Sequence, residues 1–206
     1  MSSIYGFLDP RNADRRVSND LLDTMRDKLG HAPEDCLQSG TSTPGYALGC
    51  HRPSGTLYTG KDLQVAVTGR PWWSERSFQS IASEKGHSHA AAEAYRRLGT
   101  DLLQHLHGSF SIAIFDPRAE YALIAVDRIG TRPLAFSATE NSLIIASRAD
   151  AILAHPDVSK ELDPQGLFNY LYFHMVPSPG SIYRGVEKLL PGECLTYHKG
   201  AVNRTF

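Results

Sequence analysis

Two kinds of hydrophobic spacing alternate along the chain, and each kind predicts a different element. Apolar residues three to four positions apart are typical of an amphipathic helix. This spacing predicts helices over residues 19–29, 74–84, 89–107, 148–154 and 164–173. In front of the last of these, Asp163 is a suitable N-cap and Pro164 suits the first helical position.

Short β-branched or aromatic runs between turn residues predict strands. They occupy residues 46–48, 56–58, 63–67, 109–115, 121–126, 134–137, 143–146 and 194–197, with further extended structure near Ile182. The runs between residues 109 and 146 predict an antiparallel meander, whereas residues 32–60 are expected to form hairpins and loops. Helices grouped around two sets of antiparallel strands predict a layered α+β domain.

Composition favours one ordinary globular domain over residues 1–206, because no convincing linker divides the 206 residues. Lys+Arg (21) and Asp+Glu (22) nearly balance, which argues against non-specific binding to nucleic acid. No apolar run approaches the roughly 20 residues of a membrane span, and the first residues do not resemble a secretory signal. The cytosol is therefore the expected location, without a membrane partner.

The spacing of the cysteines and histidines argues against metal binding. The three cysteines, Cys36, Cys50 and Cys194, are far apart in the sequence and are expected to be reduced thiols. The histidine pairs 87/89 and 105/107 fall within or beside a helical pattern, in which residues two apart point in different directions. No metal and no cofactor is expected.

Two stretches in the second half carry a resemblance to a known family. Residues 106–116 read LHGSFSIAIFD and residues 125–134 read AVDRIGTRPL. These motifs resemble the glutaminase domain of asparagine synthetases, and the similarity continues through residues 146–148, 153–156, 162–163, 170–171, 176–177 and 185–192. It is nearly continuous from Tyr46 onward, whereas before Tyr46 only the spacing of Ile4 and Gly6 supports it.

The resemblance implies a class II glutamine amidotransferase domain with the four-layer αββα fold of N-terminal-nucleophile hydrolases. In that family, removal of the initiator Met exposes a Cys whose thiol attacks the amide of glutamine, and its own α-amine acts as the base. A thioester forms, and ammonia passes to an ATP-dependent synthetase domain. A backbone amide and an Asn side chain stabilise the oxyanion.

Aligning the family's first residues with this chain places Ser2 at the position of the nucleophile. A serine hydroxyl ionises far less readily than a thiol, whose pKa lies near about 8.5, so Ser2 would depend wholly on a base. A serine in the second position normally permits removal of Met1, and serine acts as the N-terminal nucleophile in other branches of this fold.

The family's oxyanion turn, Asn-Gly-Glu, aligns with Thr68-Gly69-Arg70. Gly69 keeps the backbone donor, although the glycine has an alternative explanation as a residue of a tight turn. Thr68 offers a short hydroxyl in place of the amide, and Arg70 replaces a carboxylate. Both oxyanion positions of the family thus have a counterpart in this chain, Gly69 with the same backbone donor and Thr68 with a different side-chain donor.

Two further positions concern the ends of the substrate. The family Arg that binds the α-carboxylate of glutamine aligns with Arg52, which as a loop residue has the alternative of a plain surface cation. The family Asp that receives the α-ammonium aligns with His87, and an imidazole cannot supply that negative charge. The Asp127-Arg128 pair has a catalytic interpretation as one alternative, but it is expected to close a hairpin and to anchor a loop by an ion pair. Trp72-Trp73 is expected to pack in the core, with an exposed recognition patch as the alternative.

Two functions remain open. In the first, the chain has lost glutaminase activity and docks as a non-catalytic subunit or module on an asparagine-synthetase-like, ATP-dependent partner. In the second, it is an active glutaminase subunit that uses Ser2 as nucleophile, binds glutamine and supplies ammonia to that partner. No pyrophosphate-binding Ser-Gly-Gly-x-Asp-Ser loop and no Walker motif occurs in the sequence, so the synthetase domain is expected to lie outside this chain.

Overall fold

Two six-stranded sheets form the centre of the molecule. The computed structural model describes residues 3–11, 14–38 and 45–206. The first sheet has the strand order β10-β8-β9-β1-β3-β2. Its strands are β1 (Ile4–Leu8), β2 (Cys36–Gln38), β3 (Tyr46–His51), β8 (Ala135–Ala138), β9 (Leu143–Ala146) and β10 (Glu187–Lys188).

The second sheet has the order β12-β11-β7-β6-β5-β4. Its strands are β4 (Gly55–Thr59), β5 (Gln64–Trp73), β6 (Leu106–Asp116), β7 (Tyr121–Val126), β11 (Cys194–His198) and β12 (Ala201–Thr205). Every strand pairing in the two sheets is antiparallel among the described residues.

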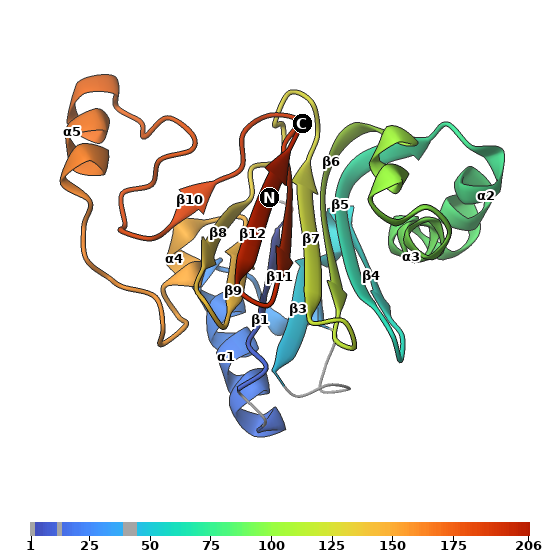
Figure 1. The fold of residues 1–206 in the computed structure, drawn as a ribbon, viewed down its shortest axis with the longest axis horizontal. Helices are drawn as coiled ribbons and strands as arrows, with labels where there is room; N and C mark the ends of the chain where they lie inside the picture. The colour runs from blue at the N-terminus through green and yellow to red at the C-terminus, as the bar shows by residue number, and fades with distance from the viewer. Residues whose placement is uncertain (1–2, 12–13, 39–44) are drawn as a thin grey trace.

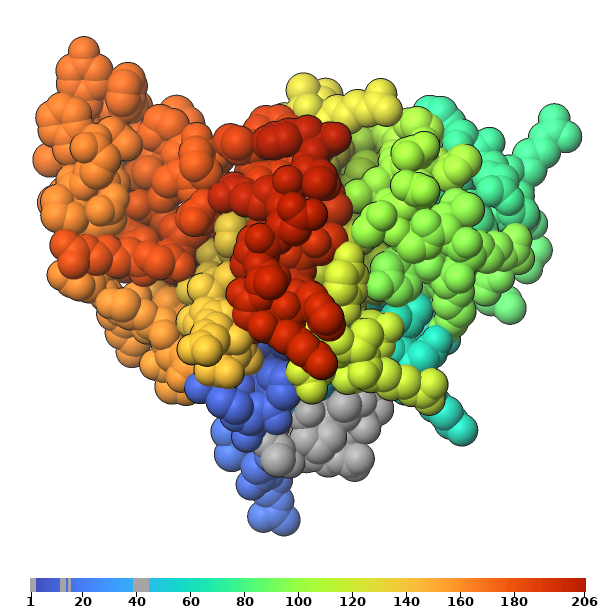
Figure 2. All heavy atoms as spheres, in the orientation of Figure 1, coloured from blue at the N-terminus to red at the C-terminus, as the bar shows by residue number. Residues whose placement is uncertain are grey.

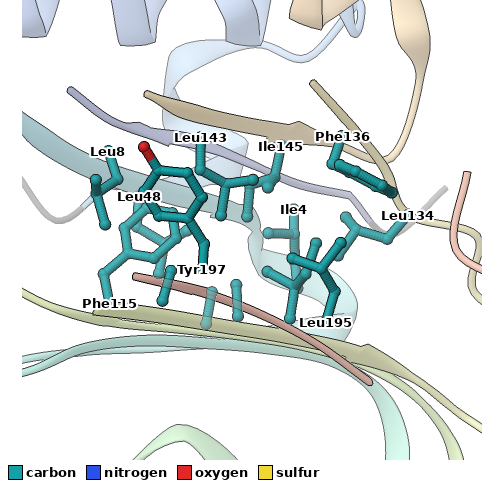
Figure 3. Packing of buried hydrophobic residues seen from close by; sticks show 14 of the residues in the cluster. Ile4, Leu8, Leu48, Phe115, Leu134, Phe136, Leu143, Ile145, Leu195 and Tyr197 are labelled. Carbon is teal, nitrogen blue, oxygen red and sulfur yellow. The ribbon is translucent and has the colours of Figure 1, made fainter. Parts of the chain in front are cut away.

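The inner faces of the two sheets pack directly on each other (Figure 3). Leu48 and Ile145 from one sheet meet Phe115 and Tyr197 from the other, and all four side chains are almost wholly buried. Burial of apolar surface of this extent is the main favourable contribution to folding. The sandwich is therefore the central core.

Helices cover both outer faces (Figure 1). Helices α2 (Arg76–Lys85) and α3 (His87–Leu98) pack on the second sheet, where alanines of α3 let the helix approach the strands closely. Helices α1 (Arg15–Lys28) and α4 (Ala149–Ile152) cover the first sheet. Three packed clusters thus separate four layers, and the predicted αββα fold class is confirmed.

The helix expected over residues 89–107 is too long. Helix α3 ends at Leu98, a 3₁₀ segment (Gly99–Gln104) follows, and β6 already begins at Leu106. Gly99 has a φ of +59°, a backbone conformation that L side chains rarely adopt, so glycine permits the chain to leave the helix there.

The predicted meander is also wrong, because its four strands do not lie in one sheet. Strands β6 and β7 pair in the second sheet, whereas β8 and β9 pair in the first. The chain crosses between the sheets over residues 127–134. Asp127 holds this crossing: its carboxylate accepts hydrogen bonds from the backbone N–H groups of Phe110, Ile129 and Thr131, not an ion pair from Arg128 as predicted.

Of the other local predictions, some are confirmed and some are wrong. Helix α5 (Pro164–Phe173) has the predicted bounds, and Asp163 accepts a hydrogen bond from Gly166 N at 2.7 Å as its N-cap. Trp73 is buried as predicted, but Trp72 is half exposed and stacks on His107. Near Ile182 only an isolated bridge forms, between Leu162 and Tyr183.

Two features are absent from the described residues. No helix in that part of the chain is long and apolar enough to cross a membrane. No group of three or more His, Cys, Asp or Glu side chains there is arranged to hold a metal ion. Cys36, Cys50 and Cys194 are buried free thiols.

Candidate functional site

The candidate site lies in the second sheet, where β5 and β6 pair. Arg70 is opposite Ser109 in this pairing, and Gly69 is opposite Phe110. Gly69 has a φ of +109°, and a Cβ placed there would lie 2.2 Å from the carbonyl oxygen of Ser109. Only glycine fits, so the close approach of the two strands itself depends on this residue.

A cavity of about 430 Å³ opens at this point. The β5–β6 pair contributes Gly69, Arg70 and Ser109, and the remaining lining residues come from the end of β3 with the 3₁₀ turn after it and from the crossing loop. These are His51, Pro53, Ser54 and Arg132. Four separate segments of the chain therefore form one pocket, and neither Arg70 nor Trp72 fills it.

The cavity carries positive charge. Arg70 and Arg132 both line it, and no acidic residue from the described part of the chain does so. Among the described residues, no carboxylate lies within 4.0 Å of either guanidinium. Both cations are therefore available to a ligand.

A chain of hydrogen bonds positions Arg132. Its Nε donates to Ser109 Oγ at 3.4 Å, and Ser109 Oγ lies 2.6 Å from Thr131 Oγ1. The Thr131 hydroxyl in turn donates to Asp127. Burial alone would raise the pKa of Asp127, but the hydrogen bonds from Thr131, Ile129 and Phe110 outweigh it and hold that pKa below its ordinary value.

Thr68, a predicted oxyanion position, is buried and already has a partner. Its Oγ1 lies 2.8 Å from Ser111 Oγ on the neighbouring strand. Thr68 is not among the residues that line the cavity. Gly69, the other predicted oxyanion position, does line it.

Arg52 lies at the rim. It is exposed in the 3₁₀ segment Arg52–Ser54, between His51 and Pro53, which both line the cavity. The guanidinium of Arg52 is not itself among the lining groups.

His87 is placed apart from the cavity lining, at the first position of α3. Its Nδ1 is buried and has no hydrogen-bond partner among the described residues. Burial lowers the pKa of His87, so the imidazole is neutral at pH 7. A neutral ring cannot pair with an ammonium group by charge.

Ser2 lies outside the described residues, but the next residue, Ser3, is described and contacts two histidines. Ser3 accepts a hydrogen bond from His51 N at 3.0 Å through its carbonyl oxygen, and its Oγ lies 2.8 Å from His31 Nε2. The rings of His31 and His51 stack with centroids 4.2 Å apart. The start of β1 is thus tied to His51, which lines the cavity.

Sequence reasoning did not find Ser109, Arg132, His51 or Ser54 as site residues. Ser109 and Arg132 both belong to the stretches that resemble the family, but nothing in their local pattern distinguishes them. They meet only because β5 pairs with β6 and the crossing loop folds back over Ser109.

Comparison of the sequence with known proteins agrees with this geometry. A family model described as a glutamine amidotransferase domain matches residues 78–206, which is more than half of the chain. The chain is 28% identical over 151 residues to "Asparagine synthetase [glutamine-hydrolyzing] 3" of Bacillus subtilis, covering 73% of this chain and 23% of that protein. It is also 28% identical over 116 residues to a "Putative asparagine synthetase [glutamine-hydrolyzing]" of Mycobacterium bovis, covering 55% of this chain and 18% of that protein.

The fold of nearly the whole chain is similar to that of solved structures. The structure titled as the allosteric regulatory enzyme of purine biosynthesis matches with a TM-score of 0.58 at 12% identity. Glutamine phosphoribosylpyrophosphate amidotransferase from B. subtilis matches with a TM-score of 0.53 at 13% identity. Each match covers 98% of this chain and 48% of the other.

The chain spans about a quarter or less of the length of these curated relatives. The family match, the four-layer sandwich and the similarity to asparagine synthetases agree with one another. The chain belongs to the glutamine amidotransferase domain family, as a class II domain of the asparagine-synthetase-like kind.

Proposed function

We propose that this domain has lost glutamine hydrolysis and serves as a non-catalytic module of an amide-forming synthetase. The observation that carries the proposal is the lining of the cavity, which among the described residues has two arginines and no carboxylate. The α-ammonium of glutamine would find no opposite charge there and would face Arg70 and Arg132. Like charges at short range disfavour binding.

The chemistry of hydrolysis is weakened as well. The hydroxyl of Thr68 is buried beside Ser111 and does not line the cavity, so it is not placed to stabilise an oxyanion there. Removing one such donor costs about 10²- to 10³-fold in rate where it has been measured in other enzymes. The hydroxyl of Ser2 in place of a thiol adds a further loss.

We propose that the domain docks through α5 and the residues around it. This helix stands at the edge of the molecule (Figures 1 and 2). Phe168, Leu171, Tyr172 and Phe173 expose more than half of their surface, and Met175 beyond the helix does the same. A contiguous apolar patch on a folded domain typically marks an interaction site.

The partner that fits the family is an ATP-dependent, amide-forming synthetase of the asparagine synthetase type. The curated relatives are named for that activity, and most of their length lies outside the matched region. We propose that residues 1–206 form a single domain, that the synthetase is supplied by a separate chain, and that both act in the cytosol.

One observation favours the second candidate, an active glutaminase with Ser2 as nucleophile. The cavity is open, and Gly69, which aligns with the backbone donor of the family's oxyanion turn, lines it. In this case Met1 is removed, and the α-amine of Ser2 is the base.

Intact mass combined with a glutaminase assay separates the two candidates. The proposal predicts that no glutamate is released from glutamine by the purified chain, whether or not Met1 is retained. Release of glutamate by a chain that begins at Ser2, together with loss of release in Ser2→Ala, would establish the second candidate instead. For docking, co-purification with the synthetase-like chain is expected, and failure to bind that chain would contradict it.

A further inference from the structure

We infer that the cavity between β5 and the crossing loop binds a small dianion that carries no cationic group, such as a dicarboxylate or a phosphate monoester. The inference rests on the proposed loss of hydrolysis, because a cavity that hydrolyses glutamine has to admit its α-ammonium. The juxtaposition of Arg70 and Arg132 around one cavity carries it.

The two guanidiniums come from different elements. Arg70 belongs to β5, whose pairing with β6 runs without interruption from Gln64 to Trp73. Arg132 belongs to the crossing loop, which Asp127 fixes through backbone hydrogen bonds. Both cations are therefore anchored to well-ordered backbone before a ligand arrives, which lowers the entropy lost on binding.

Donor capacity in the cavity is largely unused. A guanidinium carries five N–H donors, and the one contact of Arg132 with a described residue in this region is Nε to Ser109 Oγ at 3.4 Å. The hydroxyl of Ser54 and the imidazole of His51 line the same cavity. Planar guanidiniums of this kind bind carboxylate and phosphate oxygens in pairs.

Asp127 is the carboxylate connected to this region, and it does not cancel the positive charge. It is buried, and its oxygens accept from Phe110 N, Ile129 N and Thr131 N as well as the Thr131 hydroxyl. Its charge is thus compensated by these donors, and its side chain faces the loop backbone. Arg70 and Arg132 remain without a carboxylate partner among the described residues.

The test is calorimetric titration of the purified full chain with glutarate, inorganic phosphate, glutamate and glutamine. Glutarate has the carbon chain of glutamine, a carboxylate in place of the amide, and no ammonium group. We expect glutarate or phosphate to bind at least about tenfold more tightly than glutamine, since one additional charge-assisted hydrogen bond is enough to change the affinity by about that factor. The glutarate and phosphate arms distinguish a dicarboxylate from a phosphate ligand.

Three variants locate the binding. Arg70→Gln and Arg132→Gln, on separate elements, are each expected to weaken anion binding about tenfold. Arg118→Gln removes an exposed arginine in the β6–β7 turn and is expected to leave the affinity unchanged. Circular dichroism of each variant shows whether it is folded, and two cavity variants keep the test decisive if one fails to fold.

Several results would overturn the inference: binding of neither anion, glutamine bound as tightly as glutarate, or equal anion affinity in all three variants. A glutamate-release assay on the same preparation distinguishes failure of the dianion site from failure of the proposed function. If the chain neither binds an anion nor releases glutamate, the dianion site is wrong and the proposed function stands. If the chain releases glutamate, the proposed function is wrong; if it also binds glutamine as tightly as glutarate, the dianion site is wrong as well.

Discussion

Gly69 and Ser109 approach so closely across the β5–β6 pair that a Cβ on Gly69 would lie 2.2 Å from the carbonyl oxygen of Ser109. Real Cβ atoms do not come this close to a backbone oxygen, so the glycine sets the distance between the strands at the cavity. Because Arg70 and Ser109 both line the cavity, its shape depends on this contact.

The first prediction concerns this contact. Gly69→Ala is expected to lower the free energy of unfolding by about 2–5 kcal/mol, because it combines a positive φ with a backbone clash. Gly30→Ala is a matched control: Gly30 also has a positive φ, of +73°, but nothing lies within 4 Å of its Cβ position. The control is expected to cost about 1–2 kcal/mol. Urea denaturation measures both, and equal losses would contradict the clash.

The second prediction concerns Asp127. Asp127→Asn is expected to cost about 1–3 kcal/mol, because its amide group would face backbone N–H donors that now meet a carboxylate oxygen. Asp116→Asn is the control, since Asp116 accepts from the N–H groups of Arg118 and Ala119 in an exposed turn, and a smaller loss is expected there.

The loss of unfolding free energy caused by Asp127→Asn is expected to become smaller as the pH falls. The pKa of Asp127 in the folded protein lies below its ordinary value, because hydrogen bonds to the charged carboxylate outweigh its burial. The stability it contributes is therefore present above the unfolded-state pKa of about 3.9 and is lost as the pH falls through the folded pKa. Urea denaturation from pH 7 down to pH 3 is expected to show the Asp127→Asn difference shrinking at the acid end. A difference that grows toward low pH would contradict the assignment.

The third prediction concerns α5. Leu171 and Tyr172 are 67% and 70% exposed, so Leu171→Glu is expected to change the free energy of unfolding by no more than about 0.5 kcal/mol. The same substitution is expected to weaken binding of the synthetase-like partner at least about tenfold, because it places a charge in the apolar patch.

Gln165→Glu is the matched control for α5. Gln165 is exposed on the same helix, so this change adds the same charge without removing apolar surface. Partner affinity measured by surface plasmon resonance is expected to stay close to that of the unaltered chain. Unchanged affinity in Leu171→Glu would place docking elsewhere, and equal loss of affinity in both variants would assign the effect to charge alone.

The fourth prediction concerns the nucleophile. Ser2→Cys alone is expected not to produce glutaminase activity, because the described lining of the cavity still has no carboxylate for the α-ammonium and Thr68 still lies outside that lining. Glutamate release is the measurement. Substantial release by the single variant would mean that the thiol is the one missing group, which is the opposite of our account.

Much of the fold follows from local sequence. The bounds of α5 agree with its apolar spacing and with the Asp163-Pro164 start, and β7 and β9 agree with their β-branched runs. β1 was missed as an element because all five residues from Ile4 to Leu8 are buried, so the run has no alternation that would identify a strand. β12 was missed for the opposite reason, since it is an edge strand with little apolar character.

Some residues of the candidate site could be predicted from the sequence, and others could not. Gly69 and Arg70 were found through the resemblance to the family, whereas the strand expected over residues 63–67 and the tight turn at Gly69 are wrong, because β5 continues to Trp73. Arg132 and Ser109 could not be predicted, since their meeting depends on the crossing between sheets, which the expected meander did not contain. His87 begins α3 outside the cavity lining, so alignment by counting did not place its side chain in the pocket.

The most direct test of the central claim is the rate of ammonia release from glutamine by the purified chain, with and without the synthetase-like partner. The B. subtilis relative named as a glutamine-hydrolysing asparagine synthetase is the positive control. Our account predicts no release above the rate of buffer alone in either condition. Sustained release at the ordinary enzymatic rate of about 1 s⁻¹ or more would contradict it.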